Sequence, residues 1–91
     1  MSETLSEELE IQNIKGLHAR AAAAFVKTAE GFNAEIDVER SGQLVSGRSI
    51  MGLMMLAASK GTTIKVSASG DQAKEALEAI ASLVNNKFGE D

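Results

Sequence analysis

The residue with the clearest chemical potential is the single histidine of the chain, His18, followed two positions later by an arginine. It stands in the run Gly16-Leu17-His18-Ala19-Arg20. The surrounding pattern predicts that a helix begins here, so the N–H groups of its first turn lie beside the imidazole. A neutral imidazole is nucleophilic, and those N–H groups and Arg20 would stabilise an attached phosphoryl group. The run indicates a phosphoryl acceptor, although on chemistry alone such a histidine more often has a surface or capping role.

The composition argues against several other classes of function. A formal net charge of −4 and the lack of Tyr and Trp disfavour binding of nucleic acid. The chain has no cysteine, which excludes disulfides, thiolate zinc sites and cysteine nucleophiles. With one histidine, a histidine-based metal site is not expected, so we expect neither metal nor cofactor. Ser41, Ser46 and the acidic residues form no evident triad with His18 and are interpreted as surface groups.

The length and the hydropathy pattern predict one compact cytoplasmic domain. Ninety-one residues leave room for a single core, so residues 1–91 are expected to form one domain with a frayed start over residues 1–6, and a monomer is the simpler expectation. The acidic start is not followed by a signal-peptide pattern. The apolar stretches at residues 21–26 and 50–58 are too short to span a bilayer, so we expect no membrane insertion.

The first half of the chain predicts three strands and one helix. Alternation over residues 9–12 predicts a strand, and residues 19–30 carry apolar positions at helical spacing, with Gly31 as the closing C′ residue. Residues 34–39 alternate again and connect through turn residues to residues 43–46, as in a β-hairpin.

The second half predicts helix, strand and helix. Ser49 can cap a short helix running to about Ala58 and ended by Gly61, and residues 62–69 form an alternating strand. The last helix opens after Gly70-Asp71 and carries one apolar stripe. The stripe consists of Ala73, Leu77, Ile80, Ala81 and Val84. The order β-α-β-β-α-β-α predicts an α/β sandwich with helices on one face of a mainly antiparallel sheet.

Two sequence blocks at the expected separation resemble one known family. The first runs Asn13-Ile14-Lys15-Gly16-Leu17-His18-Ala19-Arg20, with Phe25-Val26 in the helix after it. The second runs Ser49-Ile50-Met51-Gly52-Leu53-Met54-Met55-Leu56, followed by Lys60-Gly61 and Ser69-Gly70. Over roughly residues 9–88 the chain resembles the HPr family, the histidine-containing phosphocarriers of the phosphoenolpyruvate-dependent phosphotransferase system.

The resemblance implies a fold and a reaction. The fold would be a two-layer α+β open-faced sandwich, with sheet order 1-4-2-3 and three helices on one face. His18 would accept phosphate at Nδ1 from phosphorylated Enzyme I and pass it to IIA domains, with Arg20 attending the phosphoryl group. The chain would then be a carrier rather than a stand-alone enzyme. Where the family usually has proline, Ala21 adds an N–H donor and leaves a less rigid first turn.

The resemblance also gives roles to the second block. Ser49 has an ordinary explanation as a helix N-cap, but the matching serine in Gram-positive relatives is phosphorylated by HPr kinase/phosphorylase. Ile50, Met51 and Met54 would form a docking patch beside His18, with Leu53 in the core.

Three alternatives remain open from the sequence. One is a nitrogen-branch carrier of the NPr type, which the ending Phe88-Gly89-Glu90-Asp91 resembles. Another is a regulatory binding module in which His18 is incidental. The last, a ferredoxin-like enzyme domain, lacks a second catalytic group.

Overall fold

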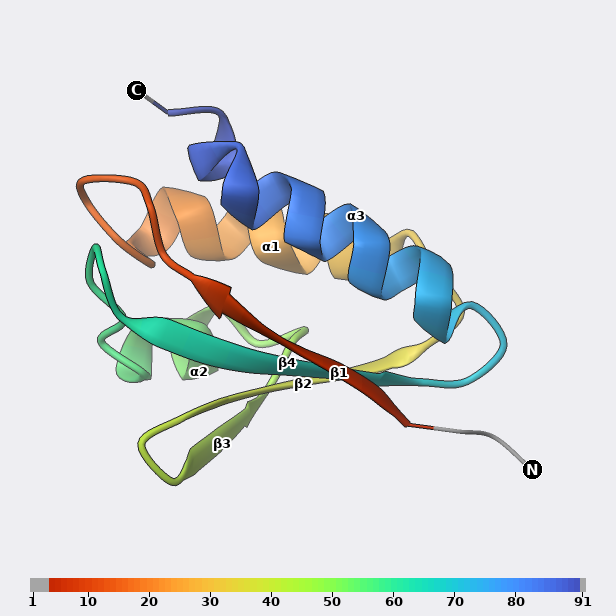
Figure 1. The fold of residues 1–91 in the computed structure, drawn as a ribbon. Coiled ribbons are helices and arrows are strands. Elements are labelled where there is room, and N and C mark those ends of the chain that lie inside the picture. Colours follow the sequence, from red (N-terminus) through yellow and green to blue (C-terminus); the bar gives the residue numbers. More distant parts are fainter. Residues whose placement is uncertain (1–3, 91) are drawn as a thin grey trace.

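The computed structural model describes residues 4–90, and in this part of the chain strands and helices follow one another in the predicted order (Figure 1). The elements are β1 (Leu5–Glu10), α1 (Ala19–Glu30), β2 (Glu35–Arg40), β3 (Gln43–Ser46), α2 (Ile50–Met55), β4 (Thr63–Ser69), α3 (Ala73–Asn85) and a short 3₁₀ turn, η1 (Lys87–Gly89).

The strands form one antiparallel sheet in the order β1-β4-β2-β3, which confirms the predicted order 1-4-2-3. Ile64 of β4 pairs with Leu9 of β1, and Val66 pairs with Val38 of β2. Successive side chains of a strand point to opposite faces, so these apolar residues share one face. The other face carries polar residues such as Lys65 and stays exposed.

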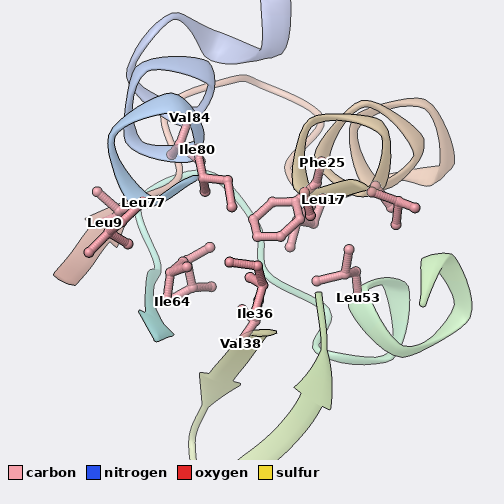
Figure 2. Close-up of a cluster of buried hydrophobic side chains, with 14 of the residues drawn as sticks. Leu9, Leu17, Phe25, Ile36, Val38, Leu53, Ile64, Leu77, Ile80 and Val84 are labelled. Carbon is pink, nitrogen blue, oxygen red and sulfur yellow. The ribbon is translucent and has the colours of Figure 1, made fainter. Parts of the chain in front are cut away.

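The core lies between that apolar face and the helices (Figure 2). Phe25 of α1, Ile80 of α3 and Leu53 of α2 are fully buried and point into the same cluster. All three helices therefore contribute to one layer, and the predicted placement of Leu53 in the core is confirmed.

Several boundaries differ from the predictions. The first strand begins earlier than predicted, because β1 starts at Leu5 and pairs with β4 from Leu5 opposite Ala68 to Glu10 opposite Thr63. Residues 1–3 of the predicted frayed start lie outside the described part. Gly31 closes α1 as the C-cap itself, with a right-handed φ of −77°. The turn η1 was not predicted.

The second helix is shorter than predicted, since α2 ends at Met55. Ala57 has a φ of 52°, which a right-handed α-helix does not accommodate. The carbonyl of the next residue, Ala58, accepts the N–H of Leu17 at 2.9 Å, so the chain after α2 is used to hold the loop that carries the histidine.

Candidate functional site

The loop before α1 is fixed by a close approach of two backbones. A Cβ at Gly16 would lie 2.4 Å from the Ala58 carbonyl oxygen, and Gly16 has a φ of +67°, so only glycine fits here. Leu17 is buried immediately after it. Gly16 and Leu17 bring the loop against the segment that follows α2. They thereby place His18 at the N-terminus of α1.

His18 is the N-cap of α1, with extended backbone angles. Its carbonyl accepts the N–H of Ala22 at 2.8 Å, which starts the helix. Its ring atom Nδ1 accepts the backbone N–H of Arg20 at 3.4 Å, a long and weak contact. About 27% of the side chain is exposed, so the imidazole is held by the helix start and reachable from solvent.

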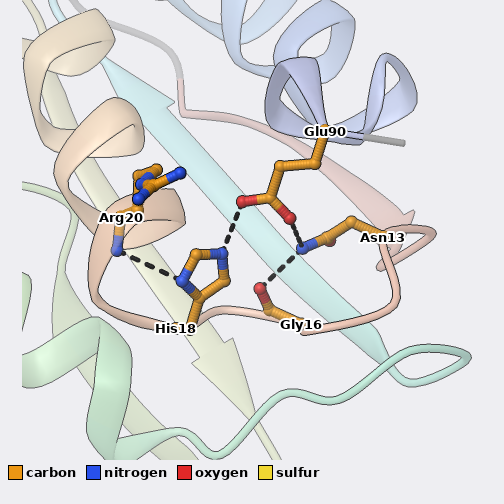
Figure 3. A network of polar contacts seen from close by, with 5 residues as sticks. All are labelled: Asn13, Gly16, His18, Arg20 and Glu90. Carbon is orange, nitrogen blue, oxygen red and sulfur yellow. Dashed lines mark hydrogen bonds and ion pairs between the residues drawn. The ribbon is translucent and has the colours of Figure 1, made fainter.

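The other ring nitrogen contacts a carboxylate that is remote in sequence, that of Glu90 (Figure 3). His18 Nε2 lies 2.5 Å from Glu90 Oε2, although the two residues are 72 positions apart. The hydrogen bond to His18 is the main cause that holds the pKa of Glu90 below its ordinary value. The Asn13 amide acts in the same direction, while burial opposes both. Glu90 is therefore ionised at neutral pH.

Asn13 ties the carboxylate to the loop. It is fully buried, and its Nδ2 donates to the Gly16 carbonyl at 2.8 Å and to Glu90 Oε1 at 3.0 Å. Both partners can only accept, so the amide nitrogen must face them and both of its N–H bonds are used. Its Oδ1 has no hydrogen-bond partner within residues 4–90. Asn13 thus fixes the distance between the carboxylate and the histidine loop.

The position of Glu90 depends on the turn after α3. Phe88 is buried against the core, and both it and Gly89 have positive φ values of 55° and 77°. The Glu90 N–H then donates to the Lys87 carbonyl at 2.8 Å, closing the turn. Sequence analysis missed Glu90 because the residue is remote from His18; the usable signal was an aromatic residue and a glycine directly after an amphipathic helix.

Arg20 and Ala21 occupy the first turn of α1. Arg20 is exposed and lines a shallow depression together with His18, Glu90, Ile14 and Lys15, so two cationic side chains flank the imidazole. Ala21 is the third residue of the helix and is buried, with its N–H in the part of the turn that α-helical bonding leaves unpaired.

The predicted regulatory and docking residues lie on α2. Ser49 is its N-cap, and its Oγ accepts the Gly52 N–H at 2.9 Å. Ile50, Met51 and Met54 are exposed, Met51 by 73%, and so is Met55. The segment after the helix, residues 57–59, borders a second hollow next to His18. The segment that follows α2 therefore lies beside His18.

Within residues 4–90 no cluster of acidic, cysteine or histidine side chains has the arrangement of a metal site. No helix in the same range combines the length and the apolar character needed to cross a bilayer. The accessible groups around His18 are instead N–H donors, two cations and one carboxylate.

A partly exposed imidazole at a helix start, on an open-faced α+β sandwich, is the arrangement expected of a small phosphocarrier protein. The family profile described as "PTS HPr component phosphorylation site" matches residues 5–86. The chain belongs to the HPr family, the phosphocarriers of the phosphotransferase system.

Similar proteins agree in sequence and in structure. The phosphocarrier protein HPr of Neisseria meningitidis serogroup A is 48% identical over 86 residues, covering 94% of this chain and 97% of the relative. That of Pseudomonas aeruginosa is 48% identical over 84 residues, covering 91% and 93%. The crystal structure of HPr-C-His from Thermoanaerobacter tengcongensis superposes with a TM-score of 0.91 at 46% identity, covering 96% and 98%.

Proposed function

We propose that this chain accepts a phosphoryl group on Nδ1 of His18 from phosphorylated Enzyme I and passes it to IIA domains in the cytoplasm. The observation that carries the proposal is the place of the ring, exposed at the N-cap of α1 with Nδ1 turned toward the first-turn N–H groups. The Nδ1 lone pair forms the N–P bond while the bond between phosphorus and the donor breaks. The electron pair of that broken bond stays with the donor.

Groups of this chain then stabilise the charge of the phosphoryl group. The negative oxygens of the phosphoryl group face the N–H groups of the first turn and the positive end of the helix dipole. The Arg20 guanidinium lies in the same depression and supplies planar charged donors. Ala21 leaves one more N–H in this turn than the proline usual in the family.

Intact mass after incubation with Enzyme I and phosphoenolpyruvate tests the proposal. One acid-labile phosphate is expected on the natural protein and none on His18→Ala, because the chain has a single histidine. A far-UV circular dichroism spectrum equal to that of the natural protein excludes unfolding of the variant. Phosphate uptake by His18→Ala at the normal rate would refute the assignment.

A second part of the proposal concerns α2. We infer that Ile50, Met51 and Met54 contact Enzyme I, and that a kinase of the HPr kinase/phosphorylase type modifies Ser49. The exposure of these side chains supports docking, because partner surfaces favour apolar groups that can adapt their shape. Phosphate on Ser49 would place a dianion beside that apolar surface and weaken docking.

A further inference from the structure

The Glu90 carboxylate joins two groups from the other end of the chain, the Asn13 amide on one oxygen and the His18 ring on the other (Figure 3). The proposed phosphoryl transfer uses only one ring nitrogen, Nδ1. The contact on the other nitrogen is the shorter of the two ring contacts, at 2.5 Å against 3.4 Å. Its role therefore needs an explanation of its own.

We propose that Glu90 is a positioning residue that holds the neutral His18 ring in the tautomer with hydrogen on Nε2, which leaves the Nδ1 lone pair open for the phosphoryl group. The inference rests on the proposed function for its meaning in the reaction. Asn13 supports it by holding the second oxygen of the same carboxylate at 3.0 Å.

The two ring contacts independently require this tautomer. An ionised carboxylate can only accept a hydrogen bond, so Nε2 must carry the hydrogen. A backbone N–H can only donate, so Nδ1, which faces the N–H of Arg20, must carry the lone pair. The opposite tautomer would lose both hydrogen bonds.

The contact with Glu90 matters most once a phosphoryl group arrives. Bonding of phosphorus to Nδ1 uses the lone pair and ends the acceptor contact with the Arg20 N–H, so Glu90 alone continues to hold the ring. Attack by the neutral imidazole places positive charge on the ring, and the hydrogen remains on Nε2. The adjacent carboxylate stabilises that charge, as the acidic member of a catalytic triad does for its histidine.

The same charge arrangement serves the release step. When the N–P bond breaks toward an acceptor, its electron pair returns to Nδ1 and the ring becomes neutral again with the hydrogen still on Nε2. No proton has to enter or leave through Glu90 in either direction. Lys15 and Arg20 line the same depression. Their cationic groups can only donate hydrogen bonds, so they can serve the phosphoryl oxygens but not the hydrogen on Nε2.

The test is imidazole nitrogen NMR on protein labelled with ¹⁵N-histidine, in which the single histidine gives one pair of ring signals. At a pH where the ring is neutral, the natural protein is expected to show hydrogen on Nε2 only. Glu90→Ala should show a mixture of both tautomers, and Glu90→Asp should recover part of the preference. Glu78→Gln, an exposed glutamate on α3, is the charge-matched control and should match the natural protein.

The kinetic arm uses Enzyme I and phosphoenolpyruvate. Glu90→Ala is expected to take up phosphate roughly 10-fold more slowly than Glu78→Gln, a typical cost of losing a group that orients a functional histidine.

If Glu90→Ala still showed hydrogen on Nε2 only, the inference would be overturned, whatever its rate of phosphate transfer. A mixed tautomer with a control-like rate would overturn the role in the reaction. Failure of the natural protein to take up phosphate would refute the proposed function, while the tautomer measurement would still decide the role of Glu90.

Discussion

At the scale of single residues, the site combines backbone donors that any helix start provides with side chains that depend on the amino-acid sequence. The N–H groups around His18 would bind any anion, whereas Arg20 supplies a charged planar group at one edge of the depression. The relative weight of these contributions can be measured one side chain at a time.

Arg20→Ala is expected to remain phosphorylatable but to transfer phosphate about 100-fold more slowly, the usual effect of removing one donor to a developing negative charge. Arg20→Lys should recover only part of the rate, because the two parallel N–H donors are lost. Rapid-quench measurement of phosphate transfer from Enzyme I gives both values. Lys27→Ala, which removes an exposed cation farther along α1, is the control, and equal kinetics for the two alanine variants would contradict the role of Arg20.

Glu90 makes a second residue-scale prediction, on stability and pH. The pKa of Glu90 is depressed in the folded protein, chiefly by its hydrogen bond with His18, so its ionised form stabilises the fold. That contribution is fully present above the ordinary glutamate pKa of about 4.3 and is lost as the pH falls through the lower folded value.

Urea unfolding should therefore show Glu90→Gln to be less stable than the natural protein at pH 7, with a difference that narrows as the pH is lowered below about 4.3. The exposed Glu78→Gln should show no such narrowing. A difference for Glu90→Gln that stays constant over this range would show that the lost charge is not what destabilises the variant.

At the scale of elements, the six-residue helix α2 has a buried side chain on one side and exposed apolar side chains on the other. Leu53 packs in the core, while Met51 points outward and Ser49 caps the helix start. A change on the outer side can thus alter binding without disturbing the packing.

Ser49→Asp should keep the capping interaction and the favourable charge at the helix start, leaving the free energy of unfolding within about 1 kcal/mol of the natural value. The Michaelis constant for Enzyme I should rise, because a charge then stands beside the apolar side of α2. Thermal unfolding and steady-state kinetics check the two parts separately, and an unchanged Michaelis constant would contradict docking on α2.

Met51→Glu places a charge directly on the same side and should raise the Michaelis constant with little effect on stability. Leu44→Glu is the matched control: Leu44 is also exposed, by 64%, but it pairs with Glu39 on the polar face of the sheet, away from the helices. Equal effects of the two substitutions on the Michaelis constant would argue against a specific docking patch.

The elements that are best predicted from the sequence are those whose caps and apolar pattern lie close together along the chain. Both ends of α1 were predicted, because its capping histidine and its apolar stripe are close in sequence. The start of β1 was missed, since Ser6 and Glu7 look like a polar tail and become a strand only by pairing with β4. The early end of α2 was missed because the carbonyl of Ala58 serves the distant residue Leu17.

The site shows the same division. His18 and Arg20 are recognisable from one short run, and their placement at the start of α1 agrees with that prediction. Glu90 and Asn13 could not be paired from the sequence, because their contact depends on the folded path of α3 and on the turn set by Phe88.

At the scale of the whole molecule, α3 and the turn after it connect the core to the histidine. Phe88→Ala should remove the buried ring that anchors this turn, at a cost of up to about 3 kcal/mol for a ring at the edge of the core. Glu90 should then lose its position, and the imidazole nitrogen signals should resemble those of Glu90→Ala. A Phe88→Leu variant, which keeps much of the apolar contact, should retain the natural signals; identical spectra for both variants would show that the ring is not the anchor.

The position of Glu90 after the last buried residue of the core has a practical consequence for proteolysis. Every buried residue of the described core precedes Gly89, so an exopeptidase that trimmed the chain back to Gly89 would leave a folded protein with its sheet, its helices and its histidine. Such a species would lack the carboxylate that contacts the imidazole and the Glu90 N–H bond that closes the turn after α3. A preparation with ragged ends would therefore pass as homogeneous by circular dichroism while containing two populations of histidine.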